Sequence, residues 1–191
     1  RPFLLLTALA WSLSSLCIAC GREDPRPGFM SMFALCMGGN LGLTVAQDAV
    51  SFYAFFALMT FSAYKLVVQA KTEESFKAGR IYLFMAVGAE GLLAAGFMLA
   101  VYHSPSHYFS DIALAMAGLS SSHPVFWLLF LGFGVKAGII CVHFWLPLAH
   151  PVAPAPASAV LSGAMIKAGL LGWLHFFPLG AASFPGWGTV F

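Results

Sequence analysis

The chain has 191 residues, of which 60% are hydrophobic and only 8% are charged. A typical soluble domain carries about 25% charged residues, so this composition excludes a soluble globular protein and indicates an integral membrane protein. The formal net charge of +2 at pH 7 gives no indication of nucleic acid binding.

Six apolar segments follow one another along the chain, and we expect each to cross the membrane as a helix. They cover residues 3–20, 29–46, 49–68, 81–102, 124–147 and 157–177. The fifth contains Pro124 and Pro147 and is expected to break around residues 139–147. The predicted fold is an all-α membrane protein, a polytopic bundle of transmembrane helices with one discontinuous helix. Because the chain starts at Arg1 rather than Met, we expect residues 1–191 to be a fragment of one transmembrane domain.

The connections between the predicted spans differ in charge on the two sides of the membrane. One side holds Arg22, Arg26, Lys71, Lys77 and Arg80, whereas the opposite loops carry Asp48 and Asp111. Cytoplasmic loops hold an excess of lysine and arginine, so the basic loops are expected in the cytoplasm. Residues 103–123 are predicted to form a longer loop.

The stretch 134–169 differs from the rest, because two lysines lie in apolar sequence on either side of a proline run. Lys136 and Lys167 each lie in the middle of a predicted span. A charge at the bilayer centre costs about 2.5–3.5 kcal/mol on insertion scales, so such lysines favour a function over a structural ion pair. Irregular backbone at this depth is tolerated only where protein or a water-filled cavity covers it. We therefore expect an ion path beside a broken helix. The prolines of the run are Pro147, Pro151, Pro154 and Pro156.

Glu90 is the only carboxylate well inside a predicted span. It is the natural partner of Lys136 or a neighbouring proton carrier, and small residues on its helix face suit close helix packing. Lys65 lies at a helix end, where its side chain can reach water. The cysteines show neither a disulfide framework nor metal-ligand spacing. They are Cys17, Cys20, Cys36 and Cys141.

His143 and His150 lie beside the proline run, and histidine titrates near neutral pH, as a proton relay requires. The alternative is that both are structural polar residues whose hydrogen bonds are satisfied at a helix break. Haem ligation is a weaker possibility, since it usually needs facing histidines on separate helices. Three further histidines in the 103–123 loop are expected to be solvated, namely His103, His107 and His123. We assign no metal, no cofactor and no catalytic residue, and nothing supports nucleotide chemistry.

A family resemblance rests on the run VKAGIICVHFWLPLAHPVAPAPASAVLSGAMIKAG at residues 135–169. It resembles the antiporter-like, proton-translocating subunits of respiratory complex I, and it is similar to hydrogenase-4 component B and to formate hydrogenlyase membrane subunits. Mrp-type cation/proton antiporter subunits share the motif. The resemblance covers residues 29–178. It implies a broken helix with a central lysine, matched by Lys136, and a second lysine on the next helix, matched by Lys167.

Two positions depart from the pattern of this family. The family commonly has a glutamate on an earlier helix, in a run such as F-W-E-L-M-T, but residues 55–60 read FFALMT with Ala57 in place of the acid. We hypothesise that Glu90, on the neighbouring span, supplies the missing carboxylate. Cys141 stands where relatives often have proline, so the break is expected to be softer.

The resemblance implies a proton-translocating membrane subunit of a complex I-like NADH:quinone oxidoreductase or a membrane-bound hydrogenase complex. The subunit would pump ions without carrying redox chemistry itself. Its partners would be other membrane and peripheral subunits, the lipid bilayer, and transported protons or Na⁺. It would be a multi-pass protein of the bacterial inner membrane. The expected proton-translocation residues are Lys136, Lys167, Glu90, His143 and His150.

Two other functions are open on the sequence alone. The same fold would serve a monovalent cation/proton antiporter of the Mrp type, without redox partners. The missing acid at Ala57 would fit a structural membrane subunit with a vestigial channel. A haem-binding membrane subunit is a more distant alternative.

Overall fold

The computed structural model describes residues 2–21, 28–120, 122–139 and 142–177, and within these ranges the regular structure is helical. This confirms the predicted all-α bundle. The first elements are α1 (Pro2–Ala19), α2 (Phe29–Val45), α3 (Ala49–Val67), the 3₁₀ turn η1 (Val68–Ala70) and α4 (Glu73–Tyr102). They are followed by α5 (Phe109–Ala117), α6 (Pro124–Ala137), α7 (Trp145–Ala149), α8 (Ala155–Val160), the π-helical turn η2 (Leu161–Met165) and α9 (Ile166–Phe176).

Four of the described helical segments are long and apolar enough to cross a membrane, so the chain is a multi-pass membrane protein. They are Pro2–Ala19, Ala49–Ala70, Glu73–Tyr102 and Ala155–Phe176. The apolar helices α2 and α6 are shorter, with 17 and 14 residues. A helix of 14 residues is about 21 Å long and a bilayer core is about 30 Å thick, so α6 ends at membrane depth.

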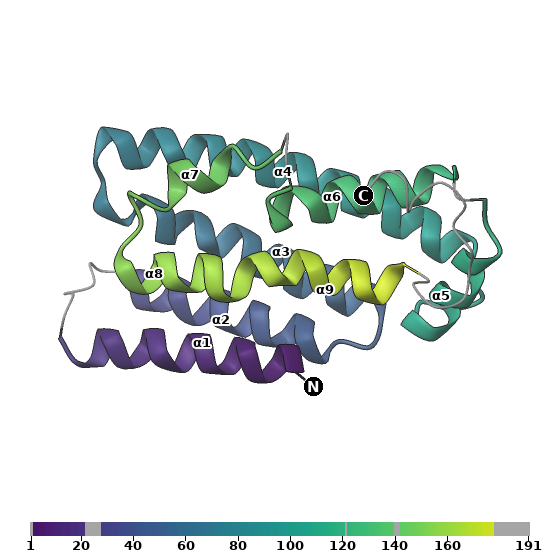
Figure 1. Cartoon of the computed structure of the whole chain (residues 1–191), viewed down its shortest axis with the longest axis horizontal. Coiled ribbons are helices and arrows are strands. Elements are labelled where there is room, and N and C mark those ends of the chain that lie inside the picture. The colour runs from purple at the N-terminus through teal and green to yellow at the C-terminus, as the bar shows by residue number, and fades with distance from the viewer. Residues whose placement is uncertain (1, 22–27, 121, 140–141, 178–191) are drawn as a thin grey trace.

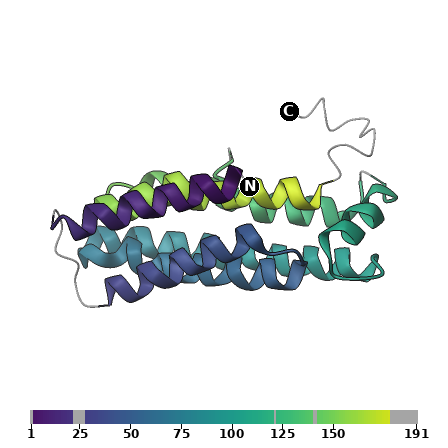
Figure 2. The same ribbon diagram turned by 90° about the horizontal axis from the view of Figure 1, so that it is seen from below.

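The long helices lie side by side along the long axis of the molecule (Figure 1). The central pairs are α2 with α3, α4 with α6, and α6 with α9. The helix α1 packs on α2 and on the helical segment α8–η2. In Figure 2, α1 lies beside α8–η2 and above α2. In this arrangement α6, the helix that carries Lys136, lies between α4 and α9.

Two crossings bring helix backbones unusually close, and each uses a glycine. A Cβ atom on Gly39 of α2 would lie 2.6 Å from the backbone nitrogen of Met59 in α3. A Cβ atom on Gly169 of α9 would lie 2.6 Å from the carbonyl oxygen of Phe133 and 2.8 Å from the nitrogen of Ala137 in α6. Small residues at such crossings allow membrane helices to pack closely.

The break in the fifth predicted span is present, and α6 and α7 are its two helical parts (Figure 1). The helix α6 ends at Gly138, whose left-handed φ of 74° suits glycine, and its amide donates to the carbonyl of Gly134. The prolines lie where no helical donor is needed. Pro147 and Pro156 fall in the first turns of α7 and α8, and the other two lie in the intervening turn.

The prediction of a loop over residues 103–123 was wrong in part, because α5 forms there. Asp111 lies in the first turn of α5, where a carboxylate favours the helix, and Ile112 and Met116 are buried. A short antiparallel bridge joins Asp48 to Tyr108 and fixes the start of α5 beside the start of α3. With nine residues this helix is too short to cross a membrane, so a search of the sequence for spans assigns the segment to a loop.

Candidate functional site

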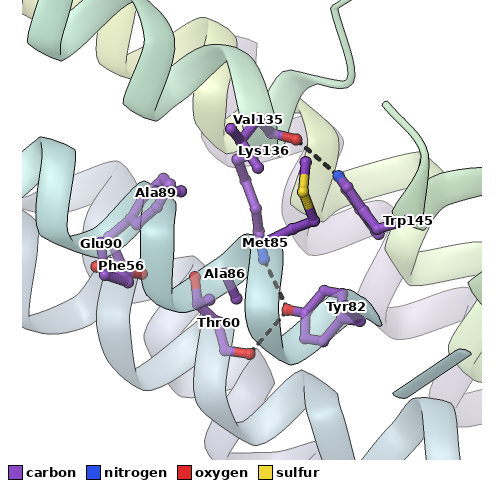
Figure 3. Close-up of a pocket in the computed structure, with 10 residues that line it drawn as sticks. All are labelled: Phe56, Thr60, Tyr82, Met85, Ala86, Ala89, Glu90, Val135, Lys136 and Trp145. Atoms are coloured by element: carbon purple, nitrogen blue, oxygen red, sulfur yellow. Dashed lines mark hydrogen bonds between the residues drawn. The ribbon is translucent and has the colours of Figure 1, made fainter. Parts of the chain in front are cut away.

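Lys136 is placed in the interior of the bundle by the last turn of α6, and its side chain is only 4% exposed. Its ammonium nitrogen donates a hydrogen bond to the hydroxyl oxygen of Tyr82 in α4 at 3.0 Å (Figure 3). The Tyr82 hydroxyl in turn donates to the carbonyl oxygen of Thr60 in α3 at 2.8 Å. Lys136 is therefore tied to two neighbouring helices through one tyrosine.

Two aromatic rings lie near the ammonium group. The nitrogen of Lys136 is 5.3 Å from the ring centroid of Tyr82 and 5.9 Å from that of Trp145. The two rings themselves meet edge to face, with centroids 5.3 Å apart. Cation–π contacts of this kind are worth about 2 kcal/mol or more where the charge is desolvated, so the rings stabilise a buried ammonium.

The same lysine lines a small cavity together with Glu90. The cavity offers about 10 Å³ to the centre of a water-sized sphere, which is enough for about one water molecule. Its walls come from α3, α4, α6 and α7, and Figure 3 shows the residues that form them. They are Phe56, Thr60, Tyr82, Met85, Ala86, Ala89, Glu90, Val135, Lys136 and Trp145.

Glu90 is 4% exposed, and neither of its carboxylate oxygens has a hydrogen-bond partner among the described residues. It does not face lipid, and it shares the cavity with Lys136, so the two charges act on each other. The expected direct contact is absent, however, because the ammonium of Lys136 bonds to Tyr82. A buried carboxylate without a donor is costly. The Thr60 hydroxyl lines the same cavity, acts on Glu90 and is itself without a hydrogen-bond partner among the described residues, so it is the available donor.

Ala57 is half-buried on α3, between the cavity-lining residues Phe56 and Thr60 of the same helix. The position at which the resembled family has its glutamate thus lies close to this cavity. Glu90 approaches the cavity from α4 instead. A carboxylate is present there, although it comes from a different helix.

Lys167 lies just after the π-helical turn η2 and is half-buried. Its ammonium nitrogen donates to the carbonyl oxygen of Gly163, four residues earlier, at 2.6 Å. A π-helical turn disturbs the regular i→i−4 ladder, and the lysine side chain supplies an additional donor to one of its carbonyls. The crossing at Gly169 places the start of α9 against the end of α6 that carries Lys136.

The two histidines beside the break have different surroundings. His150 shares a hydrogen bond of 2.7 Å with the hydroxyl of Ser158, which joins the end of α7 to α8. His143 is half-buried, and its Nδ1 atom has no hydrogen-bond partner among the described residues. Their roles in proton transfer stay predictions. Cys141, Arg22 and Arg26 lie outside the described residues.

Five aromatic rings fill the bundle at the end where α3 begins. In this phenylalanine cluster the closest ring centroids, those of Phe97 and Phe176, are 4.7 Å apart. Phe56 contacts the cluster and also lines the cavity, so it forms the boundary between the two. The cluster consists of Phe52, Phe97, Phe109, Phe133 and Phe176.

Tyr82 and Trp145 were not among the predicted site residues. Tyr82 lies four residues before Ala86 and eight before Glu90, so helical spacing from Glu90 would have placed it on the same face. Trp145 lies beside the proline run, two residues before Pro147. Its ring points back to α6, which no spacing in the sequence indicates.

Comparison with known proteins gives a family match over most of the chain. Residues 46–191 match the family described as NADH:quinone oxidoreductase/Mrp antiporter, TM. The chain is 37% identical over 146 residues to hydrogenase-4 component B of Escherichia coli (strain K12), which covers 76% of this chain and 21% of that protein. It is 32% identical over 183 residues to NAD(P)H-quinone oxidoreductase chain 4 2 of Thermosynechococcus vestitus, which covers 92% of this chain and 33% of that protein.

The fold has a counterpart among solved structures. A chain of the membrane-bound sulfane sulfur reductase (MBS), an archaeal respiratory membrane complex, matches with a TM-score of 0.83. The match covers 98% of this chain and 40% of that chain at 21% identity, and it shows a shared fold. This chain spans 21% and 33% of the length of the two curated relatives.

Proposed function

We propose, from the premise that this chain belongs to the NADH:quinone oxidoreductase/Mrp antiporter transmembrane family, that it translocates protons as a membrane subunit of a redox-driven complex. The family resemblance found at residues 135–169 is confirmed by the match. We propose further that it works beside other membrane and peripheral subunits of a complex I-like or hydrogenase-type assembly, in a bacterial inner membrane.

The observation that carries this proposal is the buried pair of ionisable groups around one cavity. Lys136 and Glu90 are each 4% exposed and lie within apolar helices. Charged groups there mark ion pathways and proton relays. Because the cavity has room for about one water, a proton can pass between the two side chains without either reaching the surface.

The second step of the proposed path is Lys167, on the neighbouring helix α9. Lys136 and Lys167 lie on the two helices that meet at the Gly169 crossing. A proton that leaves the cavity would pass this crossing toward Lys167, with His143 and His150 in the adjoining broken segment as further carriers.

The experiment that tests the proposal uses the full-length protein in its native complex. Inverted membrane vesicles are energised in turn with NADH, formate or hydrogen, and an acridine dye reports acidification of the lumen. The Lys136→Ala variant is expected to lose most of the acidification while electron transfer to the acceptor persists in part. Lys77→Ala, which changes an exposed lysine at the start of α4, is the matched control and should acidify normally.

Normal acidification by Lys136→Ala vesicles would reject the proposal. The antiporter function is distinguished in the same vesicles without an electron donor. A pH gradient is imposed and NaCl is added, and a rapid Na⁺-dependent collapse that Lys136→Ala abolishes would assign cation/proton exchange instead. The family name covers both functions, so the donor-free measurement decides between them.

A further inference from the structure

We propose that Tyr82 is a positioning residue that holds the ammonium of Lys136 away from Glu90 in the resting state. Lys136 then alternates between the Tyr82 hydroxyl and the Glu90 carboxylate. This inference rests on the proposed proton translocation and assigns the resting contact of that same site. The resembled family pattern contains no such tyrosine among the residues matched above.

The first support is the direction of the hydrogen bonds at Tyr82, that is, which group donates and which accepts. Its hydroxyl proton is directed to the carbonyl oxygen of Thr60 at 2.8 Å, and that backbone group is fixed by α3. The hydroxyl oxygen therefore presents a lone pair to Lys136, whose nitrogen lies 3.0 Å away. Tyr82 is only 2% exposed, and its ring is held against Trp145, so this acceptor is fixed in place.

The second support is the vacant carboxylate at Glu90. Both of its oxygens lack partners among the described residues, although it lines the same cavity as the lysine. Tyr82 and Glu90 stand on one face of α4, eight residues or about 12 Å apart along the helix axis. Two acceptors for one ammonium therefore line the same cavity.

The third support is the small side chain between them. Ala86 lies one turn after Tyr82 and one turn before Glu90, and it also lines the cavity. A larger side chain at this position would fill the space between the two acceptors. With alanine, the flexible stem of Lys136 can swing along the face of α4, and a water molecule can fill the acceptor that the ammonium leaves.

The hydroxyl is tested by Tyr82→Phe in the intact complex. Phenylalanine keeps the ring, its contact with Trp145 and the ring face near the ammonium, and removes only the oxygen. We expect proton pumping to fall several-fold, and the infrared carboxylate band of Glu90 to shift because Lys136 now remains beside it. That band is assigned beforehand as the one lost in Glu90→Gln.

Tyr53→Phe is the matched control. The Tyr53 hydroxyl donates to the main-chain oxygen of Glu90 at 3.4 Å and belongs to a neighbouring helix, but it makes no bond to Lys136. Its loss should leave both the pumping and the Glu90 band close to wild type. If the two variants shift the band equally, the effect is a general disturbance near Glu90 and the inference fails.

A second variant covers the possibility that Tyr82→Phe does not assemble. Tyr82→3-fluorotyrosine keeps the hydroxyl and the shape but makes the oxygen a weaker acceptor, so a smaller shift of the Glu90 band in the same direction is expected. An unchanged band overturns the inference. The proposed function is judged separately, since it fails only if Lys136→Ala pumps normally.

Discussion

The indole nitrogen of Trp145 donates a hydrogen bond of 2.7 Å to the carbonyl oxygen of Val135, across the break between α6 and α7. The break removes the regular helical donor for this carbonyl, because α6 ends two residues later. Trp145 replaces that donor and also contacts Tyr82, so the irregular segment is attached to the residue that holds Lys136.

We expect Trp145→Phe to lower the free energy of unfolding by about 1–3 kcal/mol, the cost of leaving a buried acceptor unpaired. Thermal unfolding of the detergent-solubilised protein measures this change. Trp127→Phe is the matched control, because Trp127 lies on α6 with 46% of its surface exposed. Equal stability of the two variants would show that the indole bond does not hold the break.

The crossing of α2 and α3 predicts different tolerance at two adjacent glycines. An added methyl group at Gly39 would meet the backbone of Met59, whereas at Gly38 it would meet nothing within 4 Å. We expect Gly39→Ala to destabilise the protein by about 1–3 kcal/mol through overpacking, and Gly38→Ala to stabilise it by about 0.4–1 kcal/mol. Folded yield and thermal midpoint of the two variants check this, and a tolerant Gly39 would mean that the helices can separate at little cost.

Lys167→Ala is expected to reduce proton pumping in energised vesicles to a small fraction of wild type, since it removes the second ionisable group of the proposed path. It should not prevent folding, because the ammonium of Lys167 bonds only to the carbonyl of Gly163 on its own helical segment and joins no second helix. Lys65→Ala changes an exposed lysine in the last turn of α3 and serves as the control. Equal pumping by both variants would remove Lys167 from the path.

Asp48 caps the N-terminus of α3, and its carboxylate accepts from the backbone nitrogen of Ser51 at 2.9 Å. This backbone hydrogen bond holds the pKa of Asp48 below its ordinary value of 3.8. A group whose pKa falls on folding stabilises the fold above its unfolded pKa, and the contribution is lost as the pH falls through the folded pKa.

We therefore expect Asp48→Ala to cost about 0.5–2 kcal/mol at neutral pH, through loss of the cap. Asp48→Asn keeps a capping oxygen and loses only the titration, so its stability difference from wild type should shrink as the pH falls from about 5 to about 3. Thermal midpoints over this pH range provide the measurement. A difference that stays constant would show that the carboxylate charge contributes nothing.

The fold was largely predictable because composition and proline placement dominate it. Long apolar runs allow only a few structures in a bilayer, and Pro147 and its neighbours exclude a continuous helix. The helix α5 was missed because it is too short to be a span, and contacts such as the Asp48–Tyr108 bridge, between segments about sixty residues apart, are not visible in the sequence. The π-helical turn η2 was also not predicted, since no residue type marks it.

The candidate site was predictable only in part. Lys136 and Glu90 stand out because charges are rare in apolar segments, and the structure brings both to one cavity. Tyr82 gives no such indication, because a tyrosine in a membrane helix commonly serves as an anchor at the interface. Its role as the acceptor for Lys136 depends on how α4 packs against α6, which the sequence of either helix alone does not determine.

The phenylalanine cluster makes the two ends of the bundle unequal as barriers. Hydrocarbon rings cannot solvate an ion or support a chain of waters, so the half of the bundle near Asp48 insulates the cavity from the aqueous phase on that side. A charge admitted to the cavity therefore meets its highest barrier on that side. For the proton translocation proposed above, the outlet would then lie away from the Asp48 end of the bundle.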